Sequence, residues 1–376
     1  MRRREATVLL ALLLCAASVA GQGQDGGLPR RAALGVALGP HEKGALVTGV
    51  TPGSAAAAND IRTSDIITTI DDTALRTPND LIAAIARHVG GDSVVLQIIR
   101  EDRVQPRTIV LRSLPRETLP GVEFQYDAVT LGDGSRLRTI VSVPSDDRSR
   151  HPAVMLIPGG GCGSNDVPSA PDVGSPGLVR KIAAQGYVTM RVEKSGVGDS
   201  RGPACDAIGY TQELDGYRAA LAALKRHPAV DPEKVFLLGV SLGGLFAPIL
   251  AHESPPRGII VYGTLAGPPS PYAGRSDRFF REIASVDFAG AWSAVSTPVL
   301  VLRGQFDETA VAADHARIAA LVNARHPGTA MHVELDGLDH CWTRHESMEK
   351  SRGHCGSGEP VDTFARAVLD FLERHR

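Results

Sequence analysis

The chain has 376 residues, of which 43% are hydrophobic and 22% are charged, and its formal net charge at pH 7 is −2. This length is enough for two domains with separate cores, and the composition is typical of a globular protein. The near-neutral charge excludes a strongly basic protein of the kind that binds nucleic acid or anionic lipid, and aromatic residues, at 5%, are too few for base-stacking platforms.

The N-terminus has the pattern of a secretory signal peptide over residues 1–20. Three arginines at positions 2–4 precede a short apolar run, 6–17, and a small-residue site ends at Ala20. The run is short for a bilayer span, and no second segment approaches its length, so no transmembrane span is expected after cleavage. The sequence therefore predicts export to the periplasm or the medium. A retained or lipidated anchor at Cys15 is the alternative, although Leu14 is bulky for a lipidation site.

Residues 28–113 have the pattern of a small β-rich domain with two helices. Alternating apolar residues predict strands, and Pro78 at a helix start leads an apolar face along 78–88. A shorter helix follows the turn at 51–55. The expected strands are 34–36, 45–50, 65–70, 93–100 and 108–111.

The segments "ALGVALG", "GALVTGVTPGSAAAA", "SDIITTIDDTALRTPNDLIAAIA" and "DSVVLQIIRE" resemble, in order, a PDZ domain of bacterial HtrA-like proteases. The chain departs from that family at Asn59-Asp60, where Ala-Gly is usual. The resemblance implies that an extended peptide adds a strand beside the one that begins near Leu34, facing helix 78–88. We expect the backbone amides of Leu34, Gly35 and Val36 to bind an apolar C-terminus. The alternative is a degenerate module that only stabilises or orients its neighbour.

A proline-containing linker, 114–120, leads to a second domain over residues 121–376 in which strands and helices alternate. This alternation predicts a mostly parallel sheet covered by helices on both faces. The expected strands are 122–131, 136–143, 153–157, 187–192, 235–238, 258–262, 298–302 and 331–335. The expected helices are 177–185, 211–227, 242–252, 310–325 and 363–375.

The stretch "VFLLGVSLGGLFAPIL" contains Gly-x-Ser-x-Gly between an apolar strand and a helix. Gly239 and Gly243 permit a tight turn that exposes Ser241 at the strand end, next to a helix N-terminus. A serine hydroxyl becomes a strong nucleophile only when an imidazole takes its proton and a carboxylate orients that imidazole. The chain must therefore supply both partners.

Both partners follow Ser241 in the expected order. Asp307 comes directly after the strand in "PVLVLRGQFDETA", and His340 comes after the last strand in "HVELDGLDHCW". Taken singly, Asp307 could be a helix N-cap and His340 a loop residue. Their joint placement favours a triad. The less suitable candidates for the acid or the base are Glu308, Asp336, Asp339, His345 and His354.

Stabilisation of the oxyanion requires two backbone amides. The amide of Leu242, directly after the nucleophile, supplies one, and the glycine-rich loop in "AVMLIPGGGCGSND" supplies the other. We expect the second donor to be Gly160, with Gly161 as the alternative. A phosphate-binding role for this loop is disfavoured because no Lys-Ser/Thr follows and no dinucleotide-binding spacing fits.

These motifs resemble the α/β-hydrolases, specifically the group of bacterial carboxylesterases, dienelactone-hydrolase-like enzymes and prolyl-oligopeptidase-type peptidases. "RVEKSGVGDSRG" resembles the D-x-R-G-x-G-x-S loop that this group has after the fourth strand, and "VDPEKVFLLGVSLGG" resembles its nucleophile elbow. Pro158 stands where many members have His, and Glu193-Lys194-Ser195 departs from the usual Asp/Arg pattern. The resemblance implies an α/β-hydrolase fold with a mostly parallel sheet and a short cap, and no cofactor or metal.

The expected function is a serine hydrolase that cleaves carboxylic esters or thioesters through an acyl-enzyme. Residues 264–297 contain enough aromatic side chains for a small cap and an acyl pocket: Tyr272, Phe279, Phe280 and Trp292. The alternative is a peptidase that cleaves short peptides. The PDZ domain supports this alternative, although the large propeller domain that oligopeptidases usually carry is absent from the sequence. A protein of another class, a catalytically idle PDZ scaffold, is the second alternative.

Four cysteines remain after the predicted signal, which in an exported chain suggests two disulfides. Since the third and fourth strands are neighbours in the fold that the resemblance implies, we expect Cys162–Cys205 beside the oxyanion loop. Cys341–Cys355 would then close the loop that follows His340. The alternative is zinc bound by Cys341, His345, His354 and Cys355.

Overall fold

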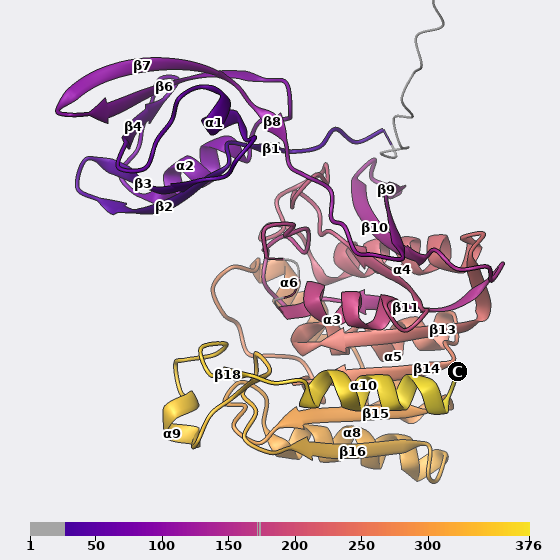
Figure 1. The fold of residues 1–376 in the computed structure, drawn as a ribbon. Helices are drawn as coiled ribbons and strands as arrows, with labels where there is room; N and C mark the ends of the chain where they lie inside the picture. Colours follow the sequence, from indigo (N-terminus) through magenta and orange to yellow (C-terminus); the bar gives the residue numbers. More distant parts are fainter. Residues whose placement is uncertain (1–26, 171, 173) are drawn as a thin grey trace, which may run out of the picture.

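A computed structural model describes residues 27–170, 172 and 174–376. The predicted signal peptide therefore lies outside the described residues. Among those described, no helix combines the length and the apolar character needed to cross a membrane. Two folded units follow one another along the chain, joined by an extended stretch after residue 113 (Figure 1).

The first unit is a β-rich domain closed around its own core. Its six-stranded sheet has the order β2-β3-β4-β6-β7, with the short β5 (Thr73–Ala74) paired to β4. The other strands are β2 (Val36–His41), β3 (Gly44–Val50), β4 (Ile66–Ile70), β6 (Ser93–Arg100) and β7 (Arg103–Val110). The helices are α1 (Ala55–Ala58) and α2 (Pro78–Ile85). Helix α2 begins where expected because Thr77 and Asp80 form a capping box ahead of Pro78.

The two ends of this domain meet. Strand β1 (Ala32–Ala33) pairs with β8 (Arg112–Ser113), so the chain enters and leaves the domain at one place. The sequence predicted a first strand at 34–36. The structure instead begins β2 at Val36, because Gly35 has a left-handed backbone (φ +83°) that interrupts the strand.

The second unit contains an eight-stranded sheet in the order β16-β15-β14-β13-β11-β12-β10-β9. Only β10 is antiparallel to its neighbours, and the other pairs are parallel. The strands are β9 (Val122–Thr130), β10 (Arg136–Pro144), β11 (His151–Ile157), β12 (Val188–Val192), β13 (Val230–Val240), β14 (Gly258–Tyr262), β15 (Val299–Gly304) and β16 (Ala330–Leu335).

Helices cover both faces of this sheet. Helices α3 (Gly174–Ala183) and α10 (Thr363–Arg374) pack on one face, where their apolar residues cluster with Val154 and Leu156 of β11 (Figure 1). Ala153 and Met155 of the same strand face the opposite cluster, which contains α4 (Tyr210–Arg226), α5 (Ala247–Glu253) and α8 (Ala312–Arg325). Because both faces are covered, the central strands are continuously apolar, as the sequence indicated.

Three parts of the second domain differ from, or add to, the sequence expectations. Strand β13 begins at Val230, five positions earlier than predicted, and the helix after Ser241 opens with a 3₁₀ turn, η1 (Ser241–Leu245). Residues 264–297 fold into α6 (Asp277–Ala284) and α7 (Phe288–Ser293). Residues 341–361, here called the histidine-side segment, contain β17 (Thr343–Arg344), α9 (Met348–Ser351) and β18 (Glu359–Pro360).

Arg30, which directly precedes the PDZ-like unit's first strands, is buried in the second domain. Its guanidinium forms ion pairs with Asp166 and Asp199, and it lies 4.4 Å from the ring centroid of Tyr126. Removing one partner of a buried ion pair typically costs about 3–5 kcal/mol. The two units are therefore joined by a buried polar contact as well as by the linker.

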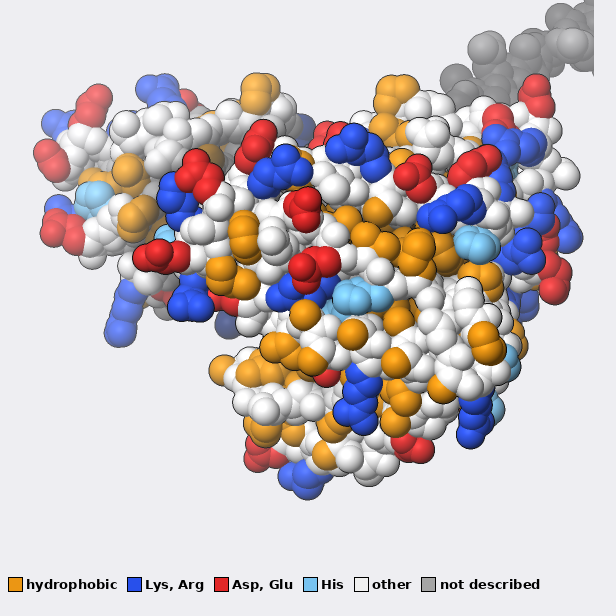
Figure 2. All heavy atoms as spheres, turned by 90° about the horizontal axis from the view of Figure 1, so that it is seen from below, with side chains coloured by type: hydrophobic (Ala, Val, Ile, Leu, Met, Phe, Trp, Pro, Cys, Tyr) orange, Lys and Arg blue, Asp and Glu red, His pale blue; other side chains and the backbone are white. Residues whose placement is uncertain are grey.

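The surface agrees with the low net charge. On the face that Figure 2 shows, acidic and basic side chains are intermixed, and neither sign gathers into a continuous patch. This face therefore offers no broad electrostatic surface for a polyanion.

Candidate active site

Ser241 follows β13 in a strained backbone conformation. Its φ is +52°, in the left-handed region that residues other than glycine rarely adopt. The turn leaves no room for larger neighbours: a Cβ on Gly243 would lie 2.1 Å from the carbonyl oxygen of Ile157. The two glycines of the motif thus let strand and helix meet closely while Ser241 is held, partly exposed, at the carboxyl end of the sheet.

Asp307 and His340 form a hydrogen-bonded pair at the same edge. The distance from His340 Nδ1 to Asp307 Oδ2 is 2.8 Å, and Asp307 is 2% exposed. The other carboxylate oxygen, Oδ1, accepts the amides of Thr309 and Ala310. Asp307 therefore does what both interpretations of the sequence required: it caps the backbone ahead of α8 with one oxygen and orients an imidazole with the other.

Gly263 places this pair beside Ser241, a role that the sequence analysis missed. Ser241 and Gly263 directly follow Val240 and Tyr262, which are paired across β13 and β14. A Cβ on Gly263 would lie 2.8 Å from His340 Nδ1 and 2.9 Å from Asp307 Oδ2. The imidazole–carboxylate pair thus packs directly against the backbone next to the serine.

One of the two hydrogen bonds that a Ser-His-Asp triad requires is present. Among the described residues, the Ser241 hydroxyl makes no hydrogen bond to His340, whereas His340 Nδ1 lies 2.8 Å from Asp307 Oδ2. In enzymes without substrate the serine–histidine hydrogen bond is often long and tightens only when substrate binds. The arrangement fits a nucleophile, a base and an orienting acid.

We predict that Gly263→Ala disrupts this pair without unfolding the sheet. The new Cβ would occupy the space of the imidazole and the carboxylate, and Gly263 has a φ of +58°, which alanine adopts with strain. We expect hydrolytic kcat to fall at least ~100-fold, since sub-ångström misplacement of catalytic groups has costs of this size. Gly267→Ala is the matched control, because nothing lies within 4 Å of its Cβ position. Equal activity of both variants would contradict the prediction.

The glycine loop after β11 lies against the nucleophile. A Cβ on Gly159 would be 3.3 Å from Cβ of Ser241, and one on Gly160 would be 3.4 Å from Cδ2 of Leu242. Lys194 Nζ donates to the carbonyl of Gly159 at 2.6 Å. Since C=O and N–H point in opposite directions across a trans peptide, the amide of Gly160 points away from Lys194. The expected donors, Gly160 and Leu242, are therefore brought together.

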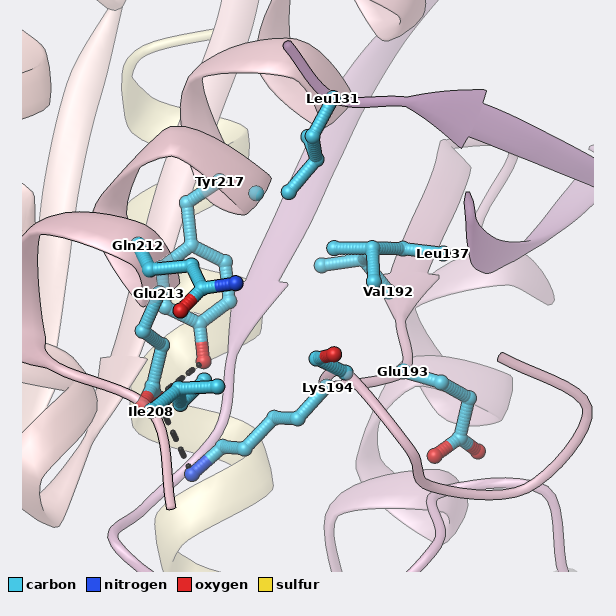
Figure 3. Close-up of a pocket in the computed structure, with 11 residues that line it drawn as sticks. Leu131, Leu137, Val192, Glu193, Lys194, Ile208, Gln212, Glu213 and Tyr217 are labelled. Atoms are coloured by element: carbon cyan, nitrogen blue, oxygen red, sulfur yellow. Dashed lines mark hydrogen bonds and ion pairs between the residues drawn. The ribbon is translucent and has the colours of Figure 1, made fainter. Parts of the chain in front are cut away.

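A buried ionic cluster supports this loop from behind. Lys194 Nζ also donates to the carbonyl of Gly161 at 3.0 Å and lies 3.1 Å from Glu213 Oε1. Arg275 pairs with the other oxygen of Glu213 and donates to the carbonyl of Gly160 at 3.4 Å. Figure 3 shows Lys194 and Tyr217 converging on Glu213, while Glu193 points the other way. Burial lowers the pKa of Lys194 well below its usual range.

This cluster was not foreseen. Lys194 stood out in the sequence only as a departure from a family pattern. Its partner Glu213 comes from α4, and Arg275, which pairs with the same carboxylate, lies just before α6. Glu193, fully buried, receives hydrogen bonds from Ser164, Asn165 and Asp166, farther along the same loop. Burial raises the pKa of Glu193 despite these donors.

Three of the four aromatic residues expected to line an acyl pocket in residues 264–297 lie in the core instead. Phe279, Phe280 and Trp292 are 0%, 9% and 0% exposed and belong to the core that contains α4 and α5. Phe279 packs edge-on against Tyr210, with 5.9 Å between ring centroids. Only Tyr272 faces the loop, since a Cβ on Gly160 would lie 2.2 Å from its hydroxyl. The aromatic residues cluster because the segment needs its own core.

The histidine loop is organised by Asp339, which the sequence analysis had considered only as a rival acid. Asp339 is 1% exposed, and its Oδ1 accepts the amides of Cys341 and Thr343. Its Oδ2 accepts from Thr343 Oγ1 and from the amide of Gly356. Burial alone would raise the pKa of Asp339, but these hydrogen bonds outweigh it and lower the pKa. Asp339 thus fixes the loop, while Asp307 contacts the imidazole.

The structure joins Cys162 to Cys205 and Cys341 to Cys355, the pairing expected from the sequence. The first disulfide links the loop after the oxyanion glycines to the loop after β12, and the second closes a span of 14 residues behind His340. The zinc alternative is wrong because two of its four ligands are bonded to each other. Among the described residues, no group of three or more His, Cys, Asp or Glu is arranged to hold a metal ion.

A groove between β2 and α2 in the first domain has a volume of about 230 Å³. The expected peptide-binding residues Leu34, Gly35 and Val36 lie on one side of it, and Leu81 and Ile82 of α2 lie on the other. Ile82 is 58% exposed. The groove is therefore open, apolar and next to an unpaired edge of the sheet, since β2 ends the strand order.

Comparisons with known proteins agree with this architecture. A PDZ family model matches residues 32–111, and a model described as serine aminopeptidase, S33, matches residues 175–324. A sequence search of curated proteins gives no match.

Several solved structures share the fold of the second domain. Est1E from Butyrivibrio proteoclasticus, solved with ferulic acid, is 17% identical with a TM-score of 0.51, covering 66% of this chain and 98% of its own. The α/β hydrolase GrgF from Penicillium sp. sh18 is 15% identical with a TM-score of 0.52, covering 67% and 99%. A putative dipeptidyl aminopeptidase IV from Bacteroides ovatus is 14% identical with a TM-score of 0.53, covering 75% and 40%. The chain thus combines a PDZ domain with a hydrolase domain of the α/β-hydrolase fold.

Proposed function

We propose that the protein is a serine hydrolase that cleaves carboxylic esters, or thioesters, through an acyl-enzyme. The observation that carries the proposal is the Asp307–His340 pair, 2.8 Å apart, packed on Gly263 beside a serine with left-handed backbone. A merely structural Asp–His contact would not require a strained serine at the neighbouring strand end.

The residues would act as follows. Ser241 Oγ attacks the ester carbonyl carbon while His340 takes the hydroxyl proton, and Asp307 stabilises the resulting imidazolium. The amides of Gly160 and Leu242 donate to the tetrahedral oxyanion. When the C–O bond breaks, His340 gives its proton to the departing alcohol. Water then enters, loses a proton to His340 and releases the acid, which restores Ser241.

A fluorophosphonate probe tests this proposal directly. We expect covalent labelling of the wild-type protein, lost in Ser241→Ala and kept in Ser285→Ala, whose hydroxyl is bonded within α6's C-terminal turn. An unlabelled wild-type protein would favour the alternative of another class, a PDZ-based scaffold without catalysis.

Cleavage of short peptides is the second candidate, which the open groove of the PDZ domain supports. A panel of p-nitrophenyl esters, acyl thioesters and aminoacyl substrates separates the two. We favour esters because the insertion above the site, residues 264–297, is small and mostly core. Faster turnover of aminoacyl amides than of esters would reverse this order.

We further propose that the PDZ groove binds an apolar C-terminus through the amides of Leu34, Gly35 and Val36. The open groove and the exposed Ile82 support this role. A screen of C-terminal peptides without a binder would instead favour a module that only orients its neighbour, consistent with the buried Arg30 contacts. We also propose that the protein is exported to the periplasm or the medium, which its two disulfides support.

A further inference from the structure

Tyr262, the last residue of β14, lies between the two strands that lead to the candidate nucleophile and the candidate acid. Its backbone is paired with Val240 of β13 on one side and with Leu302 of β15 on the other (Figure 1). Ser241 directly follows Val240, and β15 ends three positions before Asp307. Tyr262 thus lies at the carboxyl edge of the sheet, between the nucleophile and the acid.

The hydroxyl of Tyr262 reaches the loop that carries the candidate base. Its Oη donates to the carbonyl oxygen of Asp339 at 2.5 Å, and the side chain is fully buried. The amide of Trp342 donates to the same oxygen at the longer distance of 3.3 Å. This carbonyl belongs to the peptide unit whose nitrogen is that of His340. Because a peptide unit is planar, the hydroxyl fixes the backbone orientation at which His340 begins.

This hydrogen bond attaches the histidine loop to the sheet. The carboxylate of Asp339 accepts the amides of residues 341, 343 and 356, all within the histidine-side segment, so those contacts shape the loop without anchoring it. One residue earlier, the carbonyl of Leu338 accepts the amide of Phe306, on the loop of the acid, at 2.8 Å. Two successive carbonyls are therefore anchored, and the bond from Tyr262 is the one nearer to His340.

The chain leaves space for this contact. A Cβ on Gly304 would lie 2.6 Å from Tyr262 Oη and 2.3 Å from the carbonyl oxygen of Leu338. The ring of Tyr262 packs edge-on against Trp342, with 6.2 Å between centroids, and lies 4.5 Å from the ring of Phe364 in α10. Packing on two aromatic rings fixes the direction in which the hydroxyl points.

The hydroxyl remains a donor because of its surroundings. Burial, together with the nearby negative charges of Asp307 and Asp339, raises the pKa of Tyr262 above its ordinary value. The phenol therefore keeps its proton over the pH range in which a hydrolase is assayed.

The residues after Tyr262 are held as well. The amide of Gly263 donates to the carbonyl of Leu302 at 3.1 Å, and the amide of Thr264 donates to Nε2 of His315 at 3.2 Å. Since Nε2 of this imidazole accepts, its proton is on Nδ1, which lies 3.0 Å from the carbonyl oxygen of Val311. The backbone on which the Asp307–His340 pair packs is thus fixed, and Tyr262 extends this support to the loop of the base.

We propose that Tyr262 is a positioning residue of the hydrolase, whose hydroxyl holds the Asp339–His340 peptide so that the imidazole stays bonded to Asp307 beside the serine. The inference rests on the proposed function, since it concerns how the base of that reaction is held. The hydroxyl contacts no reacting atom and transfers no proton. Catalytic groups need placement within about 0.5 Å, and a misplacement of about 1 Å can lower the rate about 10²-fold.

Tyr262→Phe tests the proposal, because it removes the hydroxyl and keeps the ring that packs on Trp342 and Phe364. Tyr187→Phe is the matched control. Tyr187 lies in the same core cluster, directly before β12 and therefore at the amino edge of the sheet, and among the described residues its hydroxyl has no hydrogen-bond partner. On a p-nitrophenyl ester we expect kcat to fall about 10–100-fold in Tyr262→Phe with KM within about twofold, and no change in Tyr187→Phe.

Two further measurements separate positioning from support of the fold. In a His340→Ala background, Tyr262→Phe should change the residual kcat less than about twofold, because no imidazole is left to position. In the otherwise wild-type protein, the low-field proton NMR signal of the hydrogen bond between His340 and Asp307 should broaden in Tyr262→Phe and persist in Tyr187→Phe.

The proposal is overturned if Tyr262→Phe lowers only the thermal unfolding temperature and keeps both kcat and the NMR signal, since the hydroxyl then supports the fold alone. An equally large loss of kcat in the His340→Ala background would also overturn it, because the effect would not pass through the base. Either result with an active wild-type protein defeats this inference and leaves the proposed function intact. A wild-type protein that neither hydrolyses esters nor takes the fluorophosphonate label defeats the proposed function, and this inference with it.

Discussion

Ser241→Ala and His340→Ala are each expected to lower kcat by on the order of 10⁶-fold, because a nucleophile and its base act as one unit. Asp307→Asn should cost somewhat less, about 10⁴-fold, since the amide keeps the geometry but holds the wrong imidazole tautomer. Asp307 is almost fully buried and contacts Nδ1 of His340 directly, so no solvent molecule can take its place without rearrangement. Steady-state kinetics on a p-nitrophenyl ester measures all three.

The control for these variants is Asp336→Asn, an exposed carboxylate four positions before His340, which should leave kcat unchanged. Circular dichroism should show the same fold in every variant. The double variant Ser241→Ala/His340→Ala should be no slower than either single variant, because the residual rate then comes from binding and the oxyanion donors alone. Near-normal turnover by purified Ser241→Ala protein would refute the assignment.

Lys194→Met is expected to lower kcat by about 10²–10³-fold, the cost of losing one well-aligned oxyanion donor. The variant removes the ammonium that holds the carbonyls of Gly159 and Gly161, so the amide of Gly160 loses its fixed direction. It also leaves Glu213 with Arg275 as its cationic partner in this cluster. We expect KM to change little, because the affected donors act mainly in the transition state.

Two measurements separate this positioning role from a purely structural one. Affinity for a boronic acid, which mimics the tetrahedral intermediate, should fall in parallel with kcat, whereas KM for the p-nitrophenyl ester should change little. Lys225→Met, at the surface end of α4, is the matched control for loss of a lysine. If Lys194→Met lowers only the thermal unfolding temperature and the folded protein keeps its kcat, the ammonium supports the fold alone.

The candidate site was predictable wherever its signal is local. The elbow around Ser241 is a contiguous motif, and Asp307 and His340 each follow an apolar strand, so strand order alone brings them to one edge. The Cys162–Cys205 pairing followed from the strand order of the fold that the resemblance implies, and the Cys341–Cys355 pairing followed from the single loop that the two cysteines close. Likewise, Pro78 marked the start of α2 in the sequence.

The unpredicted parts depend on contacts between distant segments. Gly263 matters because His340, 77 positions later, packs on it. The residues that neighbour Gly263 in the sequence do not predict that contact. Lys194, after β12, and Arg275, before α6, both pair with Glu213 of α4, and the three residues are far apart in the sequence. The aromatic residues of 264–297 form a core for a small insertion, whereas the sequence predicted a ligand pocket, because aromatic composition is the same for both uses.

The two disulfides bear on when the loops around the candidate active site become fixed relative to the folding of the sheet. Cys162 lies directly beyond the oxyanion glycines and Cys341 directly after His340, so both bonds tie loops that carry candidate catalytic atoms. A newly made chain with free thiols could assemble the sheet, whose core needs neither bond, while these loops remained untied. If the protein is exported, as proposed above, oxidation of these thiols would fix the two loops only after the chain has left the compartment where it is synthesised.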